Sequence, residues 1–387
     1  MIFLTVFLDL LGFGIVIPIL PLYAKEMHAS DGKIGILLAV YSAAQLVFAP
    51  IWGRVSDRFG RRPVLLVSIL GSCFSQLGYA LAPSFWWLVV ARGFAGICGA
   101  NIAAAQAYIA DVTDEKSRAA GMGMLGAAFG LGFVFGPAAG GLLSKLGDAV
   151  PFYVASALSG VNFLLALVIL IEPRGAGERS ASRVLSWSGL VRTLSSPRLA
   201  VLMLVYLVIT FGFANLEATF TLYLSRRFHY ERSGASYLYA YVGVIMIIVQ
   251  GVLLRRIVAR VGERALVVGG TLLMGTGMLL IYLSMHLPLL FLALTAVSVG
   301  NAINTPSLTS LISRSASGAE QGGVLGVSQS LGALARILGP IFGTWALAFG
   351  VGVPYAAAAG VMAVACVIAL AAIRQPPSGN AVIAVGE

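Results

Sequence analysis

The chain has 387 residues, of which 59% are hydrophobic and only 10% are charged, and its mean hydropathy is +0.94. Water-soluble globular domains carry about 25% charged residues, so this composition excludes a soluble protein and indicates an integral membrane protein. The net charge of +10 is explained by basic loops beside anionic lipids and does not indicate a nucleic-acid binder.

Twelve apolar runs are long enough to cross the hydrocarbon core of a bilayer as helices. They cover residues 2–24, 33–53, 63–82, 85–110, 121–143, 151–171, 199–224, 235–254, 265–285, 288–312, 322–348 and 353–373. The first run lacks a basic start and a small-residue cleavage site, which predicts a retained helix and no cleaved signal peptide. We therefore expect an all-α membrane protein with twelve transmembrane helices.

The distribution of basic residues predicts the orientation in the membrane. If the N-terminus is inside, the inner loops and tails contain 17 of the 25 Lys and Arg residues, and the outer loops contain 6. Short loops rich in Lys and Arg stay in the cytoplasm. We therefore expect a multi-pass protein of the plasma (inner) membrane with both termini in the cytoplasm.

The first run contains an acid at membrane depth. Asp9 lies about 12 Å along the helix axis, and ionisable residues at such a depth are functional candidates because they are costly to bury there. A carboxylate in a low-dielectric cavity can load and release a proton near neutral pH. A structural hydrogen bond to a neighbouring helix is the alternative interpretation of Asp9.

A short charged stretch, GRVSDRFGRRP at 53–63, separates the second and third runs. Its glycines permit a tight turn and close helix approach, while its Asp and Arg side chains can form charge-assisted hydrogen bonds. The pattern resembles the loop signature of the major facilitator superfamily. The matching residues are Gly53, Asp57, Arg58, Gly60, Arg61 and Arg62.

This resemblance implies a gate at the cytoplasmic ends of the helices. In the family the loop arginines pair with an acid at the inner end of the fourth run, a role that Asp111 fits. A weaker second copy at 255–264 keeps Arg260, Gly262 and Arg264 but has Ala259 where the first copy has Asp57. A plain basic loop that only sets the orientation is the alternative.

Arg92 in the fourth run is a second ionisable residue at membrane depth. The segments LDLLGFGIVIPILPLY, which contains Asp9, and RGFAG, which begins at Arg92, resemble drug/proton antiporters and most closely tetracycline/proton antiporters. The resemblance ties both residues to proton coupling, whereas a snorkelling arginine is the alternative for Arg92. It covers most of the N-terminal half and is much thinner afterwards, so it does not identify the substrate.

The fifth run resembles the glycine-proline signature of the family's antiporters. Its members are Gly126, Gly130, Gly136, Pro137, Gly140 and Gly141. At 100° per residue all of these except Gly136 fall on one helical face, where small residues let helix backbones touch. We expect this face to seal the bundle against leak; generic small-residue packing is the alternative.

A polar stretch rich in Ser, Gly and Arg divides the chain into two similar parts. It predicts an N-terminal six-helix bundle at 1–172, a cytoplasmic linker at 173–197 and a C-terminal six-helix bundle with a short cytoplasmic tail at 198–387. Gly60 corresponds to Gly262 at an offset of 202, and Gly136 corresponds to Gly339 at an offset of 203. Such a repeat implies two bundles related by an axis along the membrane normal.

The second part adds an acid, Glu217, in the seventh run and an arginine, Arg336, in the eleventh. Glu217 is a proton-coupling candidate together with Asp9 and Arg92, although a paired structural acid is the alternative. Polar and aromatic residues at membrane depth predict a substrate cavity. The candidates are Gln45, Gln106, Phe213, Phe220, Thr221, Asn301, Asn304 and Arg336.

These observations predict a proton-coupled transporter that exports small amphiphilic compounds or drugs by alternating access. A proton-coupled symporter or uniporter of a sugar or metabolite on the same fold is the alternative. The sequence contains no phosphate-binding loop of the kind that ATP-driven proteins use. We therefore expect the proton gradient to supply the energy, and we expect no cofactor. The three cysteines fall in apolar runs, which indicates no metal site. We expect no enzymatic activity, and a monomer whose partners are protons, a small-molecule substrate and the lipid bilayer.

Overall fold

The computed structural model describes residues 2–112, 128, 130–132, 134–172, 196–315 and 321–373. Every regular element in these ranges is a helix. Within them, ten helices are long and apolar enough to cross a membrane, and one bent helix pair could form an eleventh span. The predicted all-helical membrane fold is therefore confirmed. Much of the N-terminal part of the fifth run, including Gly126, lies outside the described residues.

The helices before the predicted linker, here called the first half, occupy residues 2–172. They are α1 (Ile2–Val16), α2 (Leu20–Glu26), α3 (Asp31–Phe59), α4 (Arg61–Ala80), α5 (Phe85–Cys98), α6 (Ile102–Val112) and α8 (Val150–Ile169), with short 3-10 turns at Gly99–Asn101 and Ser144–Leu146. Residues 134–143 are also helical. The axes of α1 and α2 meet at 40°, because Pro18 between them lacks the N–H group that a continuous helix needs.

The second half occupies residues 196–373. Its helices are α10 (Pro197–Phe228), α11 (Arg232–Ile248), α12 (Leu254–Val261), α13 (Glu263–Leu283), α14 (Leu287–Arg314), α15 (Gln321–Ala346) and α16 (Val353–Ile373). A π-helical turn at Val249–Leu253 joins α11 to α12, so the eighth predicted run is one long element with a local widening.

The two halves repeat the same packing relations. In the first half α4 packs against α5 and α8, and α1 packs against α8; in the second half α13 packs against α14 and α16, and α10 packs against α16. The turn glycines correspond as well, since Gly60 has φ of +103° and Gly262 has φ of +81°. Glycine is favoured at both positions because other residues rarely adopt such a backbone conformation.

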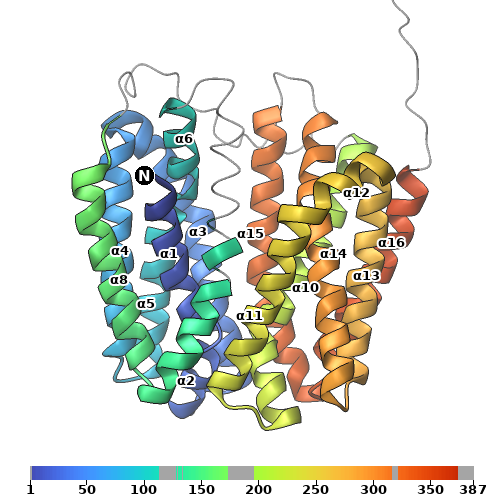
Figure 1. Ribbon diagram of the computed structural model, residues 1–387, viewed down its shortest axis with the longest axis horizontal. Helices are drawn as coiled ribbons and strands as arrows, with labels where there is room; N and C mark the ends of the chain where they lie inside the picture. The colour runs from blue at the N-terminus through green and yellow to red at the C-terminus, as the bar shows by residue number, and fades with distance from the viewer. Residues whose placement is uncertain are drawn as a thin grey trace, which may run out of the picture.

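The halves stand side by side (Figure 1) and meet at several places, which include the two described next and a contact between α2 and α10. Helix α3 packs against α15, where a Cβ atom added at Gly35 would lie 2.9 Å from the Pro340 carbonyl oxygen. The segment 134–143 approaches α11, where a Cβ atom at Gly141 would lie 3.2 Å from the Ser233 carbonyl oxygen. Close backbone approach at small residues therefore holds the interface together.

Two ends of the molecule can be distinguished. The linker end contains Glu172 and Ser196, the described residues that flank 173–195, and the opposite end, here called the far end, contains α2. Figure 1 shows the ribbons of the two halves converging around α2 and the adjacent end of α11, and standing apart where α6 and α12 lie.

Candidate functional site

The loop signature forms an ion-pair cluster at the linker end of the first half. The Arg61 guanidinium contacts Asp57 Oδ1 through Nη1 at 2.5 Å and Asp111 Oδ2 through Nε at 3.2 Å. The same Nη1 donates a hydrogen bond of 2.6 Å to the Ser56 hydroxyl. The expected pairing of a loop arginine with Asp111 is therefore present, and Arg61 makes it from a buried position.

Glu172, which no motif in the sequence indicated, completes this cluster. Its carboxylate oxygens accept hydrogen bonds from the backbone N–H groups of Arg61 at 2.6 Å and Arg62 at 2.8 Å. These groups open α4, so a carboxylate there satisfies unpaired donors and complements the helix dipole. The available signal was a lone acid at the boundary between the sixth run and the linker.

The other residues of the signature have different surroundings. The Gly53 carbonyl accepts a hydrogen bond from the Ser56 hydroxyl at 3.0 Å, and a Cβ atom added at Gly53 would contact no other part of the described chain within 4 Å. Arg58 is exposed and lies over the Phe59 ring at 5.4 Å. The Arg62 guanidinium donates to the Leu167 carbonyl at 2.8 Å. Within the described residues, Arg61 is thus the loop arginine that holds Asp111.

The glycines of the fifth run contact two different neighbours. Cβ atoms added at Gly136 and Gly140 would lie 2.6 Å from backbone atoms of α1, namely Gly14 Cα and the Ile15 carbonyl oxygen. Gly130 and Gly141 instead face Ile247 and Ser236 of α11. The expected backbone contact is present, but the single predicted face is divided, because Gly140 packs within the first half.

Pro137 belongs with the row of residues that faces α1. Its Cδ atom would lie 3.3 Å from a Cβ atom added at Gly14. The side of the fifth run that carries Pro137 and Gly140 therefore packs within the first half, while the side that carries Gly130 and Gly141 touches the second half.

Asp9 lies in α1 beside polar groups of neighbouring helices. Its carboxylate is next to the side chains of Ser72 in α4 and Asn101 in the 3-10 turn before α6. Tyr41 of α3 is within electrostatic range of Asp9, Arg92 and Arg336. Asp9 thus points into the protein, as a proton-coupling residue must, and its polar neighbours also allow the structural alternative.

Arg92 is buried in the first half, with 5% of its surface exposed. Its guanidinium carbon lies 4.5 Å from the centre of the Tyr41 ring and 5.5 Å from that of Phe13. Its Nε atom has no hydrogen-bond partner in the described part of the chain. Two aromatic faces therefore hold the charge by cation–π attraction, and the snorkelling alternative does not fit a residue that is almost completely covered.

Glu217 in α10 faces this charge from the second half. Its carboxylate interacts electrostatically with Arg92 and Arg336, yet no ion pair within 4.0 Å involves it among the described residues. Its backbone carbonyl accepts a hydrogen bond of 2.7 Å from the Tyr239 hydroxyl. An acid and two arginines from both halves therefore share one region of the interface.

The predicted cavity residues divide into three groups. Gln45 donates hydrogen bonds to the Gly99 carbonyl at 2.9 Å and the Tyr41 hydroxyl at 3.2 Å, so it links α3 to the fourth run. Thr221 lies between the halves, where its hydroxyl donates to the Pro18 carbonyl at 3.2 Å. The third group contains the remaining candidates, which do not join the halves by a hydrogen bond in the described part of the chain and whose exposure varies.

Two aromatic or amide candidates are core residues in this conformation. Phe220 is 1% exposed and packs against Tyr223 and Tyr239. Asn304 is fully buried, and its side chain lies against Gly270 of α13. Neither offers a free surface to a ligand here, because other helices cover both side chains. Helical periodicity indicates that a residue lies on an inward face, but it does not identify the neighbour that covers this face.

The other candidates range from buried to exposed. Asn301 is buried in α14, and its carbonyl accepts the Thr305 hydroxyl at 3.1 Å. Phe213 is half-buried against the core of the second half. Gln106 is exposed on α6, and Arg336 is half-buried with its Nη1 near Gly332.

The far end contains an ion pair between the halves that no motif in the sequence indicated. Both Asp31 carboxylate oxygens lie 2.7 Å from Arg226 Nη2, and Lys25 Nζ contacts Oδ1 at 2.7 Å. The only signal in the sequence was an acid at the start of the second run, opposite basic residues in other outer loops. Since Arg226 lies in the last turn of α10 and Asp31 begins α3, this contact joins the two halves.

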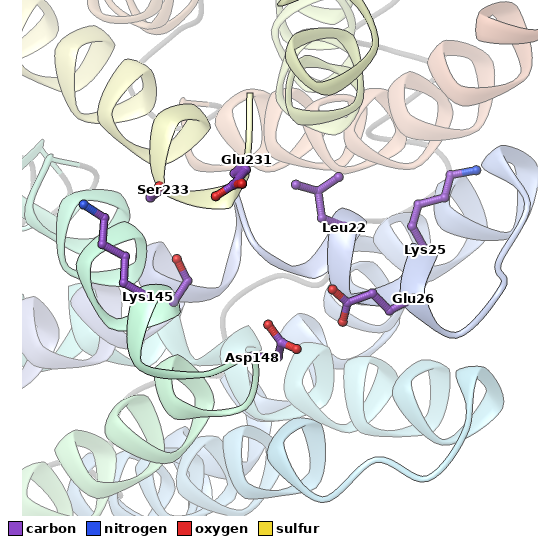
Figure 2. A pocket seen from close by; sticks show the side chains of 8 residues that line it. Leu22, Lys25, Glu26, Lys145, Asp148, Glu231 and Ser233 are labelled. Carbon is purple, nitrogen blue, oxygen red and sulfur yellow. The ribbon is translucent and has the colours of Figure 1, made fainter. Parts of the chain in front are cut away.

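A pocket of about 480 Å³ also lies at the far end. It is lined by Leu22, Lys25, Glu26, Ser144, Lys145, Asp148, Glu231 and Ser233. Figure 2 shows Glu231 and Ser233 of the second half across from Glu26 and Asp148 of the first. Charges of both signs line this pocket, so it carries no strong preference for a cation or an anion.

Comparison with known proteins agrees with this architecture. The profile of the Major Facilitator Superfamily matches residues 2–261 and 202–385. The chain is 34% identical to the Escherichia coli tetracycline resistance protein, class E, over 87% of its own length and 84% of that protein. It is 28% identical to Bacillus subtilis multidrug resistance protein 1, covering 95% of this chain and 94% of the relative.

Solved structures share the fold. The human organic anion transporter MFSD10 (TETRAN) superposes with a TM-score of 0.74 at 27% identity, covering 95% of this chain and 97% of that one. The nucleoside transporter NupG reaches a TM-score of 0.79 at 14% identity over 97% and 98% of the two chains. The profile match over almost the whole sequence, together with these relatives, places the chain in the Major Facilitator Superfamily.

Proposed function

We propose that this protein is a proton-coupled exporter of small amphiphilic organic compounds, tetracyclines or other drugs among them, that works by alternating access. The observation that carries the proposal is the position of Glu217, an acid of the second half within electrostatic range of Arg92 from the first half and of Arg336. Charges that face each other across the interface can respond to a proton, a ligand and the relative position of the halves. The names of the tetracycline and multidrug resistance relatives support drugs as the substrate class.

The orientation follows from the basic residues. The linker end contains most of the Lys and Arg side chains and is therefore cytoplasmic, with both termini on that side. The contacts between the halves that involve Thr221 and Asp31 lie at the opposite, outer end. This arrangement supports an inward-facing state, closed to the outside.

Exchange of a proton for the solute requires that the binding of one disfavours the binding of the other. A proton from outside neutralises Glu217 or Asp9, and a neutral acid no longer attracts Arg92 or a cationic group of the solute. Loss of that attraction favours the release of the solute, and deprotonation on the cytoplasmic side restores binding. The required coupling free energy is on the order of 1 to 3 kcal/mol, which two or three charges in a low-dielectric interface can supply. The exporter acts as a monomer, uses no cofactor and changes no covalent bond.

Everted membrane vesicles test the proposal. An acid interior should drive tetracycline uptake by the native protein, and Asp9→Asn or Glu217→Gln should reduce that uptake at least tenfold. Glu231→Gln, an exposed acid at the far end, is the control and should transport normally. Uptake that is independent of the pH gradient, or unchanged in both variants, would refute proton coupling; uptake only into right-side-out vesicles with acid outside would indicate the symporter.

A further inference from the structure

The second half contains a counterpart of the Arg61–Asp111 ion pair in which the two charges are exchanged. The offset of 202 that relates Gly60 to Gly262 places Glu263 at the position of Arg61, and each residue directly follows its turn glycine. The offset of 203 that relates Gly136 to Gly339 places Arg314 at the position of Asp111. The acid and the base have therefore changed places between the two halves.

The structure brings the exchanged residues together. Glu263 Oε2 lies 3.9 Å from Arg314 Nη1, and Glu263 Oε1 accepts a hydrogen bond of 2.7 Å from the Ser310 hydroxyl. Glu263 is the first residue of α13, and Ser310 and Arg314 lie in the last turns of α14. The pair thus joins the turn after α12 to the linker end of α14, just as Arg61 joins the turn after α3 to α6.

The two pairs differ in how strongly solvent screens them. The side chains of Arg61 and Asp111 are each 9% exposed, whereas those of Glu263 and Arg314 are 16% and 75% exposed. Because solvent weakens an exposed ion pair, the Ser310 hydrogen bond to the better-covered Glu263 carboxylate supplies much of the attraction in the second half. A hydrogen bond to an ionised group is stronger than one between neutral groups.

The exchange also explains why Ala259 replaces an aspartate in the second copy of the loop signature. In the first copy Asp57 stands four residues before Arg61 and contacts it. The same spacing places residue 259 four residues before Glu263, where an aspartate would bring two carboxylates together. Two carboxylates brought together across this turn would repel each other, so Ala259 fits the reversed pair and is not a chance loss of the signature.

We infer that Glu263, Ser310 and Arg314 form a second clamp of reversed polarity, which holds the turn between α12 and α13 to the end of α14 while the second half moves as a unit. The inference rests on the proposed function, because alternating access requires each half to move as a rigid body. Glu263 is in this view a positioning residue, which acts through the turn and does not contact the substrate.

A charge-reversal cycle tests the clamp. The native protein and the exchanged variant E263R/R314E are each combined with A259D and, as an uncharged control of similar size, with A259N. Transport is measured as gradient-driven tetracycline uptake into everted vesicles, and stability as the Tm of the purified protein in detergent. E263Q alone should reduce transport about fivefold, since it weakens the contacts to both Ser310 and Arg314.

The decisive result is a change of sign. A259D should lower transport about twofold and lower Tm in the native background, but should raise both in E263R/R314E, where the aspartate can contact the new arginine. A259N should have the same effect in both backgrounds. Equal effects of A259D in the two backgrounds would overturn the clamp. If the native protein takes up no tetracycline, the proposed function fails, while the Tm cycle still decides the clamp on its own.

Discussion

Replacing Gly60 by alanine tests how the loop signature is held together. The backbone at Gly60 has φ of +103°, which alanine adopts at a cost of about 2 kcal/mol. The new Cβ atom would lie 2.7 Å from the Glu172 carboxylate, so that carboxylate must move away from the Arg61 and Arg62 amides. Losing two charge-assisted hydrogen bonds costs about 2 kcal/mol after a reduction for the solvent that reaches Glu172. The expected loss in the free energy of unfolding is therefore about 4 kcal/mol.

Gly262→Ala is the matched control, because its backbone is similar but, among the described residues, no atom other than those of its chain neighbours lies within 4 Å of an added Cβ. It should show only the backbone cost of about 2 kcal/mol. Reversible unfolding in mixed detergent micelles measures both values by the same method. A Gly60→Ala loss no larger than that of Gly262→Ala, or one unchanged when Glu172→Gln is already present, would refute the contribution of Glu172.

Three further predictions concern the other contacts. Gly136→Val should abolish folding or transport, because the side chain would overlap the backbone of Gly14, and expression with a Tm scan separates the two outcomes. Asp31→Asn should weaken the outer ion pair with Arg226 and increase the fraction of outward-open molecules about threefold, measured as the reactivity of a cysteine introduced between the halves; an unchanged reactivity would show that the pair does not hold the outer end closed. Arg92→Lys should lower transport at least tenfold with little change in Tm, because an ammonium retains the charge but not the broad planar guanidinium that lies over the Tyr41 and Phe13 rings; normal transport would show that charge alone is sufficient at this position.

Local patterns were sufficient for part of the site. The turn at Gly60 was predictable because glycine and charge between two apolar runs specify a tight turn at the membrane surface. The pairing of a loop arginine with Asp111, which lies 50 residues from Arg61, was instead implied by the family resemblance. Asp9, Arg92 and Glu217 were identified because an ionisable residue inside an apolar run is unusual wherever it occurs. For the turn and for these three residues, the signal lies within a few residues of the feature it predicts.

Contacts between distant segments were not predictable in the same way. Glu172 is separated from Arg61 by 111 residues, and Asp31 is separated from Arg226 by 195. Nothing in the local pattern around one of these residues indicates which distant residue it will contact. Phe220 and Asn304 show the related difficulty, since helical spacing identifies which residues share a face but not whether that face meets another helix or a ligand.

The sequence alone determined the class of the protein, its helical spans and the family of its loop signature, because hydrophobic length and the costs of burying charge act locally along the chain. Only the tertiary structure decided which carboxylate receives which cation, how the glycines of the fifth run are shared between α1 and α11, and that the exchanged residues Glu263 and Arg314 come together. Those outcomes depend on which helix surfaces come together, and close packing selects them only when both halves are in place.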